Sequence, residues 1–207
     1  MATIPDMKSG WTSRAVGVIN HPETGFPLSI DATLFTRQEE GQNRAFLTLD
    51  SMPKELLGTD SAFLIRPEVI NQRPVVPVEV ETLPSRGCVL NMKPEAYSRE
   101  RETNAGYQIL AKAVAGPVEY AFGENPKTHF FVTWERTPGN DKAGETNYYW
   151  GHYHEDRGRA IEDFCTRVCE KCAELAEERK PSIRQQLAAE PVPGKQTAKK
   201  LRGAEAR

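Results

Sequence analysis

Three histidines in the second half of the chain have side chains that zinc commonly binds. His152 and His154 are two residues apart, so on a β-strand both imidazoles would point to the same face. His129 belongs to an earlier segment and would face them if the two segments pair as a hairpin in a suitable register. One hypothesis is therefore a three-histidine zinc site in a metal-dependent enzyme. The simpler interpretation is that these histidines pack across two aromatic strands.

Cys165, Cys169 and Cys172 form a second group of potential ligands, at spacings of four and three residues. Thiols at these spacings share one helix face, and His152 or His154 would complete a zinc site with them. The same spacing is used to hold iron–sulfur clusters, but there it lies on a loop, whereas here it lies inside a predicted helix. We predict that Cys165 and Cys172 are small apolar residues of a buried helix stripe, that Cys169 lies near its margin, and that the thiols are reduced.

Aromatic side chains are concentrated in two segments, 128–135 and 147–154, which we expect to form a hairpin. The residues predicted to bind a partner are Trp134, Tyr148, Tyr149, Trp150 and Tyr153. Such a set can contact a protein or stack the bases of single-stranded nucleic acid. Base-stacking surfaces also carry interleaved Lys and Arg, of which these segments offer little beyond Lys127 and Arg136.

The charges divide the chain into an acidic body and a basic tail. Residues 180–207 hold seven Lys or Arg and two Glu, a net charge of +5, and because the whole chain carries −2, residues 1–179 carry −7. The tail cations predicted to bind include Lys195, Lys199 and Lys200, which would add affinity for nucleic acid or an acidic partner. We predict a single α+β domain at 1–179, followed by a disordered basic tail at 180–207.

The positions of these side chains depend on the predicted elements. Alternating apolar residues predict strands at about 15–19, 28–34, 45–49, 61–66, 75–81, 87–91, 118–122, 128–135 and 147–154. Pro74 and Pro77 indicate that the strand at 75–81 is irregular or lies at a sheet edge. Helical spacing predicts a long helix at 155–179 and a shorter one near 105–114. The predicted fold class is α+β, an antiparallel twisted sheet of about six to eight strands with the long C-terminal helix packed on a face.

The sequence contains no apolar run of membrane-spanning length and no secretion signal in its first ten residues, so we expect a cytoplasmic protein that does not contact a membrane. It also contains no phosphate loop, dinucleotide-binding turn or nucleophile elbow. The leading expectation is a non-enzymatic binding or inhibitory protein without a cofactor, zinc being the alternative. Its acidic body and aromatic hairpin would bind another protein. One such class consists of phage or mobile-element proteins that block a nucleic-acid-binding partner. The alternatives are a single-stranded nucleic-acid-binding module with a basic tail and a metal-dependent enzyme using the histidines.

Overall fold

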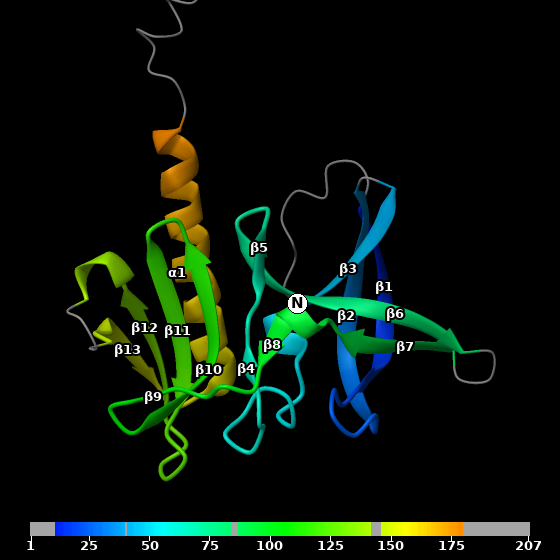
Figure 1. Cartoon of the computed structure of the whole chain (residues 1–207), viewed down its shortest axis with the longest axis horizontal. Helices are drawn as coiled ribbons and strands as arrows, with labels where there is room; N and C mark the ends of the chain where they lie inside the picture. Colours follow the sequence, from blue (N-terminus) through cyan, green and yellow to red (C-terminus); the bar gives the residue numbers. More distant parts are fainter. Residues whose placement is uncertain (1–10, 40, 84–86, 142–145, 180–207) are drawn as a thin grey trace, which may run out of the picture.

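A computed structural model describes residues 11–39, 41–83, 87–141 and 146–179, which form two mixed sheets and one long helix (Figure 1). Sheet A contains β1 (Trp11–Asn20), β2 (Pro27–Glu39), β3 (Gln42–Thr48), β5 (Glu68–Ile70), β6 (Arg73–Leu83) and β7 (Gly87–Met92). Sheet B contains β4 (Leu64–Ile65), β8 (Tyr97–Ser98), β9 (Thr103–Asn104), β10 (Tyr107–Ala115), β11 (Val118–Glu124), β12 (Phe131–Arg136) and β13 (Tyr149–His154). The predicted α+β class with one long C-terminal helix, α1 (Arg157–Glu178), is confirmed, although the strands are divided between two sheets.

Sheet A closes on itself as a small barrel. Antiparallel pairing runs through β1, β2, β3, β6 and β7, and β7 then pairs with β1. Because five is an odd number, the first and last strands of this up-and-down path run in the same direction, and the closing pair is parallel. It consists of only two residue pairs, Ile19 with Leu90 and Asn20 with Asn91.

Strand β6 is paired along both edges, so the expectation that it lies at a sheet edge is wrong. One edge pairs with β3, and the other pairs first with β5 and then with β7. Pro77 lies between the β5-paired residues, which end at Val75, and the β7-paired residues, which begin at Val78. Proline, which has no N–H to donate, thus occurs where the ladder changes partners.

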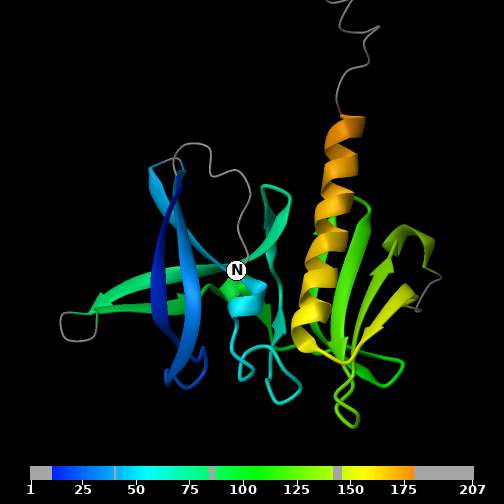
Figure 2. The same cartoon turned by 180° about the vertical axis from the view of Figure 1, so that it is seen from behind.

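Helix α1 covers one face of sheet B and contacts β10, β11, β12 and β13 (Figure 2). Asp156 caps its N-terminus, because its carboxylate accepts a hydrogen bond from the backbone N–H of Arg159. Ile161, Phe164 and Val168 recur at helical spacing and are fully buried, which confirms the predicted packing of one apolar stripe on a sheet.

The second predicted helix, near 105–114, is wrong, because these residues form strand β10. The pairing of β10 with β11 shifts register between Ile109 and Ala111, so one residue is inserted into the strand as a β-bulge. Apolar residues on either side of a bulge no longer alternate. Tyr107, Leu110, Ala111 and Val114 therefore have the spacing of a helix face while lying on a strand.

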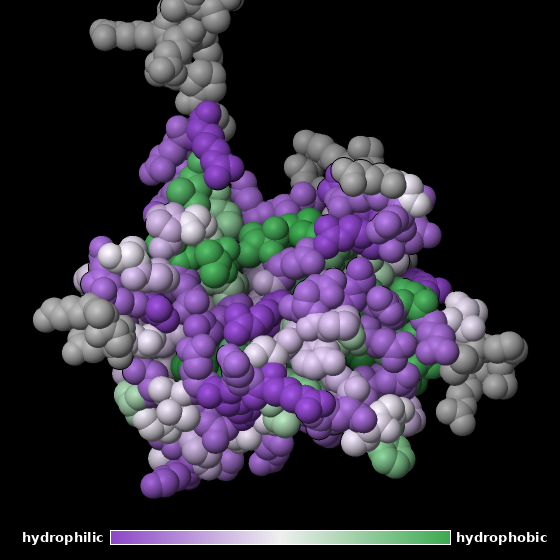
Figure 3. Space-filling view, in the orientation of Figure 1, coloured by the Kyte–Doolittle hydropathy of each residue, from purple (hydrophilic) through white to green (hydrophobic). Residues whose placement is uncertain are grey.

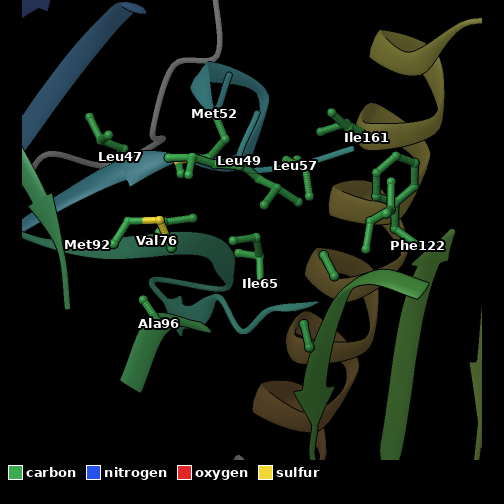
Figure 4. Close-up of a cluster of buried hydrophobic side chains, with 14 of the residues drawn as sticks. Leu47, Leu49, Met52, Leu57, Ile65, Val76, Met92, Ala96, Phe122 and Ile161 are labelled. Carbon is green, nitrogen blue, oxygen red and sulfur yellow. The ribbon is translucent and has the colours of Figure 1, made fainter. Parts of the chain in front are cut away.

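The two sheets share a continuous hydrophobic core (Figure 4). After β3 the chain forms the short 3₁₀ helix η1 (Leu49–Ser51), contributes β4 to sheet B, returns to sheet A for β5 to β7, and passes through η2 (Pro94–Ala96) into β8. In the core, Leu57 of the loop after η1 lies between Leu49 of η1 and Ile161 of α1 in the view of Figure 4.

The loop between η1 and β4 is also held by two arginines from the other half of the molecule. Arg157 donates to the carbonyls of Met52 and Leu57, at 2.9 and 3.3 Å. Arg101 donates to the carbonyls of Gly58 and Thr59, at 2.7 and 3.1 Å. Burial lowers the pKa of both guanidinium groups. These contacts fasten the barrel side of the core to α1 and sheet B.

The predicted basic tail at 180–207, with Lys195, Lys199 and Lys200, lies outside the described residues. Within the described ranges, no helix combines the length and apolar character that crossing a membrane requires. Figure 3 shows one side of the molecule as mostly hydrophilic, with hydrophobic surface beside the upper part of α1.

Candidate functional site

The face of sheet B opposite α1 carries a continuous group of aromatic side chains. We define the aromatic surface as Tyr107, Trp134, Tyr148 and Tyr153, with Trp150 at its edge. The rings of Tyr107 and Trp134 meet edge to face at 5.5 Å, and Trp134 stacks on Tyr148 at 5.7 Å. Tyr107 also contacts Tyr153, at a centroid distance of 6.1 Å. The rings therefore support one another across β10, β12 and β13.

Gly151 of β13 makes room for the Trp134 indole at the centre of this surface. A Cβ atom at Gly151 would lie 2.8 Å from the indole nitrogen, whereas one at Gly123 of β11 would lie at an ordinary 3.5 Å from the far edge of the ring. The indole thus rests over the neighbouring strands and is only 3% exposed. Trp134 organises the surface, while its neighbours supply the accessible area.

Trp150 is the most exposed of these aromatic residues, at 71%. Thr133 pairs with His152 and Glu135 with Tyr149, so Trp150 and Gly151 together face Trp134 in a β-bulge. Trp150 has a φ of +53°, in the left-handed region that bulky residues avoid. A large apolar side chain held in solvent by an unfavourable backbone conformation is characteristic of functional sites.

Tyr149 lies apart from the aromatic surface. It pairs with Glu135, and its hydroxyl shares a 2.6 Å hydrogen bond with the hydroxyl of Thr137. Ring contacts therefore bring together three of the five aromatic residues selected from the sequence, Trp134, Tyr148 and Tyr153, and the bulge places Trp150 opposite Trp134. Tyr107 belongs to the surface but was missed, because its segment was predicted to be a helix.

A network of paired charges borders the aromatic surface. Lys112 contacts Glu119 and Glu102 at 2.9 and 3.0 Å, and Arg136 contacts Glu119 and Asp141 at 3.3 and 2.6 Å. Burial alone would lower the pKa of Lys112, but its hydrogen bonds to the two glutamates raise it above the ordinary value, so the amine stays charged. Both cations are thus neutralised by carboxylates of the protein itself.

Tyr148 connects this network to the rings. Its hydroxyl donates to Glu119 at 3.1 Å, and the Arg136 guanidinium lies 5.8 Å from the ring centroid. Burial and the nearby charge of Glu119 raise the pKa of Tyr148 to about 12, so the hydroxyl remains a donor at physiological pH.

The three histidines separate into two sites. His129 lies between β11 and β12, where its Nδ1 contacts Glu124 at 2.9 Å. His152 and His154 both face Asp163 of α1, at 2.9 and 3.6 Å. Among the described residues, no group of three or more His, Cys, Asp or Glu side chains is arranged to hold a metal ion.

Asp163 instead joins α1 to the sheet. It accepts hydrogen bonds from the hydroxyl of Thr133 and from His152. Burial alone would raise its pKa, but these hydrogen bonds and the nearby imidazoles of His152 and His154 lower it below the ordinary value for aspartate. The carboxylate is therefore ionised at neutral pH and accepts hydrogen bonds from side chains of both β12 and β13.

Cys165 and Cys172 pack against the hydrophobic core, as predicted for apolar residues of the helix stripe. Burial raises the pKa of the Cys165 thiol to about 12 and also raises those of Cys169 and Cys172. Thiols with raised pKa values are poor nucleophiles, because the reactive form is the thiolate.

Comparisons with protein-family models, with characterised proteins and with solved structures found no match to this chain.

Proposed function

We propose that this chain is a non-enzymatic binding protein that contacts a partner protein through the aromatic surface, with Trp150 as the principal anchor. The observation that carries the proposal is the exposure of Trp150 at a bulge of the outermost strand of sheet B. Tyr153, 61% exposed, extends the accessible aromatic area. Trp and Tyr are the residues that most often dominate binding energy at protein interfaces.

A protein fits the surrounding charges better than a nucleic acid does. Stacking of single-stranded bases requires cations that track the phosphates. Lys112 and Arg136 already contact Glu102, Glu119 and Asp141, so a phosphate at this border would meet paired cations and three carboxylates. Exposed aromatic rings beside paired charges match the apolar centre and polar rim of a protein interface.

The partner we infer has a basic binding surface. The body carries seven more acidic than basic residues between positions 1 and 179, and complementary charge speeds association and selects partners. Nucleic-acid-binding proteins are a large class with basic surfaces. Blocking such a surface would make this chain an inhibitor of its partner.

Quantitative capture from a lysate of the source organism tests the proposal, using the wild-type chain and the Trp150→Asn variant as bait. Asparagine accepts the left-handed backbone conformation, so the variant removes the indole without adding strain. A partner that binds through Trp150 should lose affinity by about 30-fold, the effect of removing an interface anchor worth about 2 kcal/mol. The affinity of the recovered partner is then measured by calorimetry.

Phe26 provides the matched control, because it is 70% exposed and lies between β1 and β2, outside sheet B. Phe26→Ser should bind the partner as the wild type does. Capture should also persist after nuclease treatment and with a chain truncated after residue 179. Recovery that requires both nucleic acid and the tail would replace this proposal with the nucleic-acid-binding alternative.

A further inference from the structure

A groove separates the first turns of α1 from the barrel, on the side of the helix away from the aromatic surface. Its volume is about 610 Å³, which is within the range of small-molecule sites. One wall is formed by Thr48, Leu49 and Asp50, and another by the start of β6 from Arg73 to Val75. The helix supplies the remaining wall, from Gly158 to Glu170.

The floor of the groove is apolar. Leu49, Val75 and Ile161, each at most 2% exposed, close it from beneath, and the partly exposed thiols of Cys165 and Cys169 provide its accessible surface. Figure 4 shows Leu49 of η1 and Ile161 of α1 in the cluster of buried side chains between the two halves of the molecule, with Leu57 drawn between them. Burial raises the pKa of both thiols, which therefore present neutral, polarisable sulfur atoms to the cavity.

The rim of the groove is acidic. Asp50, Glu162 and Glu170 line it together with a single cation, Arg73. In the part of the chain that the structure describes, none of these four side chains forms an ion pair or a side-chain hydrogen bond. The cations beside the aromatic surface, by contrast, are neutralised by neighbouring carboxylates. The lining of the groove thus carries an excess of two negative charges, and Arg157, which directly precedes Gly158, lies near enough to Asp50 for that carboxylate to favour its charged form.

We propose that this groove binds a small amphipathic organic cation, a molecule with an apolar or aromatic body and a protonated amine. The body lies between η1, the start of β6 and α1, against the partly exposed thiols of Cys165 and Cys169, and the ammonium group lies among the three rim carboxylates. Because the ammonium is drawn from water to a partly apolar site, the carboxylates supply the counter-charge that it requires. This site is independent of the aromatic surface, which lies on the opposite face of sheet B.

Three probes of similar shape but different charge test the proposal: the cation 1-naphthylmethylamine, the neutral alcohol 1-naphthylmethanol and the carboxylate anion 1-naphthaleneacetate, called the acetate below. Titration of the full-length protein, followed by NMR or calorimetry, should show the protonated amine binding at least 10-fold more tightly than the acetate, with the alcohol between them. The amine should also slow alkylation of Cys169 by N-ethylmaleimide, measured by peptide mass spectrometry. Cys88, which lies outside the groove, serves as the internal control.

Variants at exposed positions separate charge from shape. The double variant Glu162→Gln/Glu170→Gln should weaken binding of the amine several-fold and leave the alcohol unaffected, whereas Glu177→Gln/Glu178→Gln, beyond the groove, should change neither. Thr166→Trp places an indole at the groove wall and should abolish binding of all three probes. Circular dichroism verifies that each variant keeps the helix. Equal affinity for amine and acetate, or amine binding that survives Thr166→Trp, would overturn the proposal.

Discussion

At the scale of single residues, Trp150 combines two features that each cost free energy. Its φ of +53° is unfavourable for a bulky residue, and its side chain is 71% exposed. Positive φ values of non-glycine residues cost about 1 to 3 kcal/mol and persist where surrounding structure imposes them. The sequence identified Trp150 as a candidate because of its type and its neighbours, but neither its backbone conformation nor its exposure can be inferred from composition.

Trp150→Asn should therefore separate stability from binding. We expect the free energy of unfolding to stay unchanged or to rise by up to about 1 kcal/mol, because asparagine tolerates the left-handed conformation. Urea denaturation followed by far-ultraviolet circular dichroism measures this change. A loss of more than 1 kcal/mol would mean that the indole supports the fold and that its exposure is incidental.

Asp163 is the residue whose ionisation contributes most clearly to the contact between α1 and sheet B. Asp163→Asn keeps the shape but removes the charge, and we expect a loss of about 2 kcal/mol at pH 7, the range for hydrogen bonds to charged groups. Because the pKa of Asp163 is lowered in the folded state, its contribution is complete above the unfolded value of about 4 and is lost as the pH falls below it. Urea denaturation at several pH values should show the wild type and the variant converging below pH 4, whereas a constant difference would exclude this role.

At the scale of elements, β-bulges explain both a failed prediction and the shape of the candidate site. The bulge in β10 disturbs the alternation of Ile109 and Ala111, which made a strand appear helical. The bulge in β13 places the exposed Trp150 next to Gly151, opposite Trp134 of β12. The strands at 128–135 and 147–154 were predicted because their alternation and aromatic content are strong, but a bulge depends on pairing with another strand, which a local pattern does not contain.

Gly151 is expected to be essential for the arrangement of the aromatic surface. In Gly151→Ala the added methyl group would lie 2.8 Å from the Trp134 nitrogen, so the indole must move. We predict a loss of about 1 to 3 kcal/mol in the free energy of unfolding, as for other overpacked sites, and a shifted NMR signal of the Trp134 indole N–H. Gly139→Ala is the control, because no atom lies within 4 Å of its added carbon. Equal stability of the two variants would show that Trp134 adapts freely.

At the scale of the whole molecule, the arginines that hold the loop between η1 and β4 connect the barrel to α1 and sheet B. Arg157→Met would leave the carbonyls of Met52 and Leu57 without their donor, and we expect a loss of about 2 to 3 kcal/mol in the free energy of unfolding. Arg159→Met, two residues later on an exposed position, should change stability by less than about 0.5 kcal/mol. Chemical denaturation of both variants measures the difference. Similar stability of the two would show that the loop is held by apolar packing alone.

The division of the strands between two sheets could not be predicted from the sequence. Short segments such as Leu64–Ile65 join sheet B, while their close neighbours Glu68–Ile70 join sheet A, and nothing in their local composition separates them. The helix at 155–179 was predicted well because one apolar stripe repeats over about four turns from Ile161 to Leu175, which is a local property. Pairings between distant strands, and the groove they leave beside α1, depend on the complete chain.

The odd number of strands in the barrel has a consequence for its dynamics. Four of its five strand contacts are antiparallel ladders, and the fifth, between β1 and β7, depends on two residue pairs and two side-chain hydrogen bonds, between Asn20 and Asn91 and from Arg14 to the sulfur of Cys88. Local opening follows the weakest contacts of a structure, so this seam should separate while the rest of the barrel stays closed. Amide hydrogens of β1 and β7 that face this seam would then exchange with solvent earlier than those between β2 and β3, and the barrel would behave as a curved sheet that closes and opens along one line.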